Sequence, residues 1–182
     1  MKLLSFTRLG KPGFGAVVNN GVIDLTGRLD PEINTIKDLI TLNMENDAEE
    51  YIAGKTEDLS LSDITFLPVI PNPEKIMCIG LNYLEHKKET GRPDVDNPTI
   101  FTRFADSQIA HLQPLIKPDK SERFDYEAEM AIVIGKGGRF ISEKDAINHI
   151  AGYSCYNDGS VRNYQRHTSQ FTHGKIFPGT GG

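Results

Sequence analysis

The sequence has few of the residues that stabilise small secreted domains or bind metals through sulfur. It contains no tryptophan, and its only cysteines among 182 residues are Cys78 and Cys155. These two lie far apart among apolar neighbours and form no CxxC pattern. We therefore expect two buried, free thiols in a reducing cytoplasm.

The sequence also lacks long apolar runs and an excess of positive charge. No run approaches the roughly 20 apolar residues that cross a bilayer, and the N-terminal segment has neither the apolar stretch nor the cleavage site of a signal peptide. Its 25 acidic and 20 basic residues give a net charge of −5, which gives no general attraction to nucleic acid or anionic membranes. We expect a cytoplasmic globular protein that binds neither.

Glycine and proline divide the chain into parts. The first part contains hairpin signals, including the Asn-Asn-Gly turn at 19–21, and two helical patterns. It carries no chemical motif. A cluster of prolines then marks a linker. We predict a small α+β N-terminal domain at 1–65, a linker at 66–74 and a larger domain at 75–182, which the chain length allows.

The most informative stretch is 125–135, where acidic residues precede β-branched residues and a glycine. Its second half is typical of a buried strand. Alternate residues of a strand share a face, so Asp125, Glu127 and Glu129 should point the same way. Glu127 and Glu129 would lie about 6.6 Å apart along the backbone. This spacing suits one hard cation between two carboxylates, and it is also consistent with a solvent-facing acidic edge strand.

A helical pattern at 82–91 contains a second candidate group. Asn82 can cap the helix and Gly91 suits its left-handed C-terminal position. His86 and Glu89 are three residues apart and therefore share a helix face. A carboxylate beside an imidazole fixes the tautomer and raises the basicity, as a general base requires, although such pairs are also common on exposed helices.

Polar residues near the C-terminus occupy less regular positions. Asp158 follows a predicted strand at 152–156 and is either an ordinary turn residue or a third oxygen ligand from a neighbouring strand end. Beyond it lie four donors that suit an anionic substrate and are equally consistent with a solvated surface: Arg162, Gln165, Gln170 and Lys175.

Together, four of these segments resemble the fumarylacetoacetate hydrolase family. The motifs are Ile79–Gly91 with its His and Glu, Asp125–Glu129, Tyr156–Arg162 and Gln170–Lys175. The resemblance covers residues 66–182 and implies an α+β fold, with a mixed β-roll catalytic domain after the small N-terminal domain. It also implies a homodimer.

The resemblance further implies a metal-dependent active site. The implied ligands of Mg²⁺ or Mn²⁺ are the carboxylates of Glu127, Glu129 and Asp158, and crystals of such a site can hold Ca²⁺. His86 and Glu89 look like a catalytic dyad on a lid segment. Lys175 looks like the cation that stabilises a developing oxyanion or enolate, and the donors Arg162, Gln165 and Gln170 fall where substrate would bind.

Carboxylates without His or Cys ligands favour a hard cation over zinc. A 2-oxo acid could occupy the remaining positions through its carboxylate and keto oxygens, and the metal would act as a Lewis acid as a C–C bond breaks. We therefore expect hydrolysis, decarboxylation or isomerisation of small 2-oxo or 1,3-dicarbonyl acids such as acylpyruvates.

A non-catalytic protein is the alternative. Members of the family continue well past the Gly-Lys segment, whereas this chain stops at Gly182. We expect the chain to lack the C-terminal part of the catalytic domain. Such a protein could retain the core of the fold and a bound cation without turnover.

Overall fold

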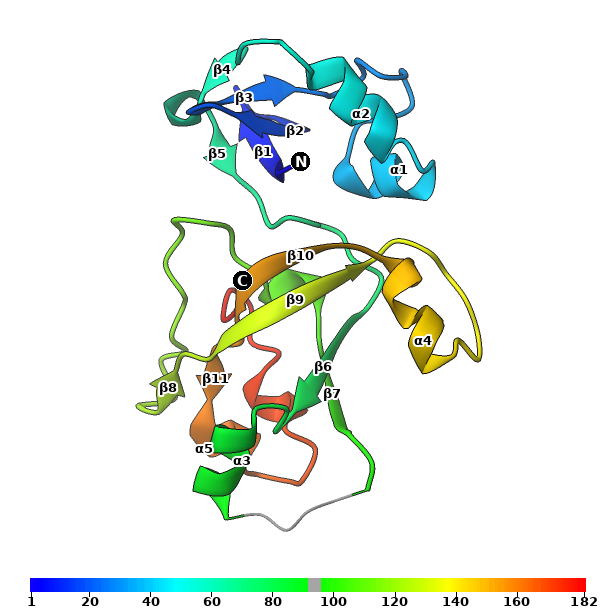
Figure 1. Cartoon of the computed structure of the whole chain (residues 1–182). Helices are drawn as coiled ribbons and strands as arrows, with labels where there is room; N and C mark the ends of the chain where they lie inside the picture. The colour runs from blue at the N-terminus through cyan, green and yellow to red at the C-terminus, as the bar shows by residue number, and fades with distance from the viewer. Residues whose placement is uncertain (92–95) are drawn as a thin grey trace. The chain divides into compact units, whose positions relative to one another are not determined.

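The computed structural model describes residues 1–91 and 96–182, apart from the side chains of His86, Glu89 and Thr90. The chain forms two units, whose elements are drawn in Figure 1. The first unit contains residues 1–71, 110–113 and 128–156. The second contains residues 72–109, 114–127 and 157–182.

The first unit contains an antiparallel sheet of five strands in the order β4-β3-β2-β1-β5. The strands are β1 (Leu3–Arg8), β2 (Lys11–Val18), β3 (Gly21–Asp24), β4 (Leu59–Ser60) and β5 (Thr65–Phe66). Val18 pairs with Gly21 across a turn at Asn19 and Asn20. The hairpin predicted from the Asn-Asn-Gly sequence is therefore confirmed.

Helices α1 (Ile36–Thr41) and α2 (Glu45–Ile52) lie beside this sheet in the first unit (Figure 1), and their side chains contribute to its core. Thr35 caps α1, because its hydroxyl accepts a hydrogen bond from the backbone N–H of Asp38 at 3.1 Å. The helices and the sheet bury a common apolar cluster that includes Phe14, Ile23 and Leu39. The predicted helices are therefore confirmed, and they stabilise a unit without chemical motifs.

Strands β9 (Ala128–Ile134) and β10 (Ile150–Asn157) pair with each other, and α4 (Glu143–Ala146) lies between them in the sequence. The expectation that β9 is buried is wrong. Its residues alternate between half-buried and exposed, with Met130, Ile132 and Ile134 on the exposed face. Their β-branched and apolar character predicts a strand but does not say which faces the described chain covers.

The second unit contains two antiparallel strand pairs and the turns that connect them. Strand β6 (Ile76–Gly80) pairs with β7 (Thr99–Arg103), and β8 (Phe124–Asp125) pairs with β11 (Ser160–Val161). Its helices α3 and α5 are short and cover Leu84–Thr90 and Arg162–Gln165.

Helix α3 agrees with its prediction at one end only. It ends at Gly91, whose φ of 61° is left-handed as expected. The N-cap residue, however, is Tyr83 rather than Asn82, and no side chain caps the first turn. His86 and Glu89 lie in this helix, but their side chains fall outside the described residues.

Neither cysteine forms a disulfide, as expected. The expectation that both thiols are buried is wrong, since Cys78 is half-buried and Cys155 is exposed. Both residues lie in two-stranded sheets, where a side chain is covered only if another layer packs on its face. Among the described residues, no helix has the length and apolar character to span a membrane.

Candidate functional site

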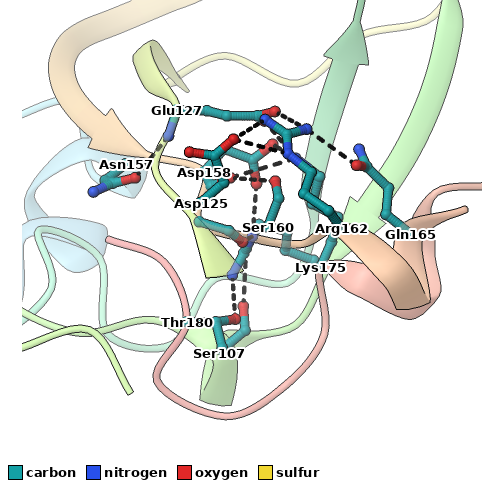
Figure 2. Close-up of polar contacts among 12 residues, drawn as sticks. Ser107, Asp125, Glu127, Asn157, Asp158, Ser160, Arg162, Gln165, Lys175 and Thr180 are labelled. Atoms are coloured by element: carbon teal, nitrogen blue, oxygen red, sulfur yellow. Dashed lines mark hydrogen bonds and ion pairs between the residues drawn. The ribbon is translucent and has the colours of Figure 1, made fainter. Parts of the chain in front are cut away.

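A cluster of charged side chains surrounds Lys175 in the second unit. Its Nζ lies 2.5 Å from Oε2 of Glu127 and 2.6 Å from Oδ2 of Asp158, and the lysine side chain is 1% exposed. Figure 2 shows these residues together with their hydrogen-bonded neighbours. Carboxylates from two distant segments therefore share one buried cation.

Backbone pairing explains how these carboxylates come together. Asp125 in β8 lies opposite Ser160 in β11, so the residues after β8 run beside the turn before β11. The N–H of Asp158 donates to the carbonyl of Glu127 at 2.8 Å. The N–H of Glu127 donates to the side-chain oxygen of Asn157 at 3.1 Å. These bonds fix the two acidic residues side by side at the level of the main chain.

Arg162 binds the second oxygen of Glu127 and also binds Asp125. Its Nη1 lies 2.6 Å from Oε1 of Glu127, and its Nη2 lies 3.0 Å from Oδ2 of Asp125. Each oxygen of Glu127 therefore faces a different cation. Burial raises the pKa of Glu127, but the charges and hydrogen bonds of Lys175 and Arg162 outweigh it and hold the pKa below its ordinary value. Glu127 is therefore ionised at neutral pH.

The two predicted glutamine donors have different surroundings. Gln165 joins the cluster, because its side-chain oxygen accepts a hydrogen bond from Nη1 of Arg162 at 3.1 Å. Gln170 is exposed, and its described hydrogen bonds are made by its backbone. The structure therefore brings Gln165, but not the side chain of Gln170, to the cluster.

Two of the three predicted carboxylate ligands converge. Glu129 lies on β9 in the first unit, where it is half-buried. Within the described parts of the chain, no three His, Cys, Asp or Glu side chains form a metal-binding group. Glu127 and Asp158 nevertheless face a single atom, Nζ of Lys175, from two sides. Oxygen donors arranged in this way fit a hard divalent cation such as Mg²⁺ or Mn²⁺.

Arg103, which ends β7, is not among the site residues predicted from the sequence. Its side chain is 0% exposed, and its Nη1 lies 2.6 Å from Oδ1 of Asp158. Alternation along β7 places it on the same buried face as Phe101. A charged residue on an apolar strand face is a signal that could have found it, because a buried charge requires a partner.

The fold agrees with the comparisons to known proteins. The profile of the fumarylacetoacetate (FAA) hydrolase C-terminal domain matches residues 75–182. The chain belongs to the fumarylacetoacetate hydrolase family, and the expected α+β fold of this family is confirmed.

Relatives and solved structures extend this result. Oxaloacetate tautomerase FAHD2A, mitochondrial, of Homo sapiens is 34% identical over 97% of this chain and 59% of its own length. A fumarylacetoacetate hydrolase from Exiguobacterium antarcticum has a TM-score of 0.80 and 27% identity, covering 100% of this chain and 64% of that one.

A maleylpyruvate hydrolase from Sphingobium sp., solved with manganese(II) and pyruvate, has a TM-score of 0.73. It is 23% identical over 96% of this chain and 63% of that one, and at this identity it shows that the folds are alike. The chain thus spans 59% of the length of the human relative and 63 to 64% of these two structures.

Several expectations stay predictions. The name of the human relative places that protein in mitochondria, so a cytoplasmic location is not established for this chain. The homodimer and the domain boundaries near residues 65 and 75 also remain predictions, as do the roles assigned to individual site residues.

The charge cluster predicts different effects for two Asp→Asn substitutions. Asp158→Asn leaves both Arg103 and Lys175 without this carboxylate, and both side chains are at most 1% exposed. In metal-free buffer it should lower the free energy of unfolding by about 3–5 kcal/mol, because a buried charge loses its partner. Asp125→Asn affects a side chain that is 51% exposed and should cost at most about 1 kcal/mol. Urea denaturation measures both values, and equal losses would contradict this account of the cluster.

Proposed function

We propose that this protein carries the metal site of a fumarylacetoacetate hydrolase-type enzyme that acts on small 2-oxo or 1,3-dicarbonyl acids. The supporting observation is that the carboxylates of Glu127 and Asp158 converge on one buried cation position. The names of two similar proteins, an oxaloacetate tautomerase and a maleylpyruvate hydrolase, refer to small oxo acids. The reaction class proposed is hydrolysis, decarboxylation or isomerisation.

Glu127 and Asp158 would hold the divalent cation, Mg²⁺ or Mn²⁺, and the ligand role expected for Glu129 stays a prediction. The bound cation would supply Lewis-acid polarisation of the substrate carbonyl and stabilise the negative charge that develops on it. The similar maleylpyruvate hydrolase structure, which contains manganese(II) and pyruvate, supports this choice of cation.

Lys175 and Arg162 would bind the anionic substrate. The three N–H donors of Lys175 are directed to Oε2 of Glu127, Oδ2 of Asp158 and the carbonyl of Asp158. With a divalent cation on the carboxylates, their attraction for the ammonium would weaken, and Lys175 could donate to a substrate oxygen. Arg162 is partly exposed and can offer its guanidinium, oriented by Gln165, to a substrate carboxylate.

His86 and Glu89 would form the general base. Both lie in the range of α3, three positions apart in the sequence, which is the spacing of the predicted dyad. His86 would take a proton from water in hydrolysis, or from the carbon next to the carbonyl in isomerisation. The access of water to the substrate would therefore decide between these reactions.

A second candidate is a non-catalytic protein that keeps the fold and a bound cation. It is favoured by the ligand set in the described part of the chain, where Glu127 and Asp158 converge without a third carboxylate. Measurements of metal binding and of turnover on the same preparation separate the two candidates.

Activity should depend on divalent metal and on Glu127. With Mn²⁺ or Mg²⁺ the purified protein should consume an acylpyruvate or oxaloacetate, seen as loss of enol absorbance, and EDTA should stop the reaction. Glu127→Gln should reduce both turnover and Mn²⁺ binding to background, because it removes a ligand charge. Glu122→Gln is the control, since Glu122 lies in the same segment with an exposed side chain. Mn²⁺ binding without turnover would favour the non-catalytic candidate, and unchanged activity of Glu127→Gln would contradict the ligand assignment.

The proposed dyad should be separable from the metal site. His86→Ala should lower kcat by about 100- to 10,000-fold, the usual contribution of a general base. Its Mn²⁺ affinity, measured by calorimetry, should equal that of the wild type. Lys88→Ala is a control on the same helix, where Lys88 forms an exposed ion pair with Glu85. A normal rate for His86→Ala would rule out this residue as the base.

A further inference from the structure

Arg103 is buried, and each nitrogen of its guanidinium donates a hydrogen bond. Burial of a charge is costly unless it is paired and hydrogen-bonded. Nε donates to the hydroxyl of Ser107 at 3.2 Å, and Nη2 donates to the hydroxyl of Thr180 at 2.8 Å. Nη1 donates to Oδ1 of Asp158 at 2.6 Å and to the carbonyl of Gly159 at 3.0 Å. One side chain thus connects the end of β7 to two turns of the second unit.

The partners of the guanidinium are themselves held in place. The hydroxyl of Ser107 donates to the carbonyl of Phe104, and the hydroxyl of Thr180 donates to the carbonyl of Phe177, each at 2.7 Å. Gly181 passes directly against the guanidinium, where a Cβ would lie 2.6 Å from Nη2 and 2.7 Å from Cζ of Arg103. Packing and hydrogen bonds therefore fix the plane of the guanidinium.

This fixed guanidinium distinguishes the two oxygens of Asp158. Oδ1 is bound by Nη1 of Arg103, whereas Oδ2 faces Nζ of Lys175 together with Oε2 of Glu127. Rotation of the carboxylate would break the 2.6 Å contact with Arg103. Only Oδ2 is therefore directed to the cation position.

We propose that Arg103 is a positioning residue that presents Oδ2 of Asp158 to the divalent cation and thereby sets the metal affinity. This inference rests on the proposed function, because it needs a cation between Glu127 and Asp158. Groups that orient metal ligands typically change metal affinity by about 10- to 100-fold. Lysine cannot replace the planar fork of arginine, since its single ammonium cannot reach Asp158, Ser107 and Thr180 together.

The test is a Mn²⁺ titration of the full chain, in which electron paramagnetic resonance measures free and bound ion. Arg103→Lys keeps the charge and should weaken Mn²⁺ binding by about 10- to 100-fold. It should also change the spectrum of bound Mn²⁺, because Oδ1 becomes free to coordinate, and a general loss of stability would not produce this change. Arg28→Lys makes the same substitution in a partly exposed ion pair with Asp58 and should leave the affinity unchanged.

A second variant covers the case in which Arg103→Lys does not fold. Thr180→Val removes one hydrogen bond that holds the guanidinium but keeps Arg103 and Asp158 intact. It should weaken Mn²⁺ binding severalfold while the circular dichroism spectrum stays that of the wild type. Wild-type Mn²⁺ affinity in folded Arg103→Lys or in folded Thr180→Val would overturn the inference.

The failure of the inference is distinguishable from the failure of the proposed function. If the wild type binds Mn²⁺ and Glu127→Gln abolishes binding while Arg103→Lys does not weaken it, only the role of Arg103 is wrong. If the wild type does not bind Mn²⁺, or if Glu127→Gln binds it normally, the proposed metal site fails and the inference fails with it.

Discussion

The need to compensate buried charge determines the arrangement of the second unit. Arg103 and Lys175 are almost completely shielded from water, and both contact the carboxylate of Asp158. The cluster contains three acids and three bases: Asp125, Glu127 and Asp158 with Arg103, Arg162 and Lys175. These charges balance without a metal. A divalent cation would add two positive charges to this set, which suits an anionic oxo acid as the substrate.

Close contacts between backbone segments of the second unit bring these charged side chains together. Gly159 follows Asp158 at a point where a Cβ would lie 2.0 Å from the carbonyl of Thr180. The N–H of Gly181 donates to the carbonyl of Ser107 at 2.9 Å, and Gly182 exchanges two backbone hydrogen bonds with Asn157. The last residues of the chain therefore hold the guanidinium of Arg103 and the Asp158 turn in one place. Gly159 permits this contact, because a Cβ at this position would overlap the backbone of Thr180.

Local features could be predicted from the sequence, because they depend on residues that are close along the chain. The Asn-Asn-Gly hairpin, the Thr35 cap and the left-handed Gly91 each follow from two to four neighbouring residues. The prediction that Asp125, Glu127 and Glu129 share one strand face assumed a continuous strand. Strand β8 ends at Asp125 and β9 begins at Ala128, and Glu127 and Glu129 belong to different units. The contact between Arg103 and Asp158 joins residues far apart in the sequence, and periodicity does not indicate which segments meet.

A crystal structure with Mn²⁺, recorded at a wavelength where manganese scatters anomalously, tests the central claim most directly. The account predicts one anomalous peak in coordination with Oε2 of Glu127 and Oδ2 of Asp158. Arg103 should remain on Oδ1, and Nζ of Lys175 should have moved away from the position between the two carboxylates. A peak elsewhere at saturating Mn²⁺, with Lys175 still bridging Glu127 and Asp158, would contradict it.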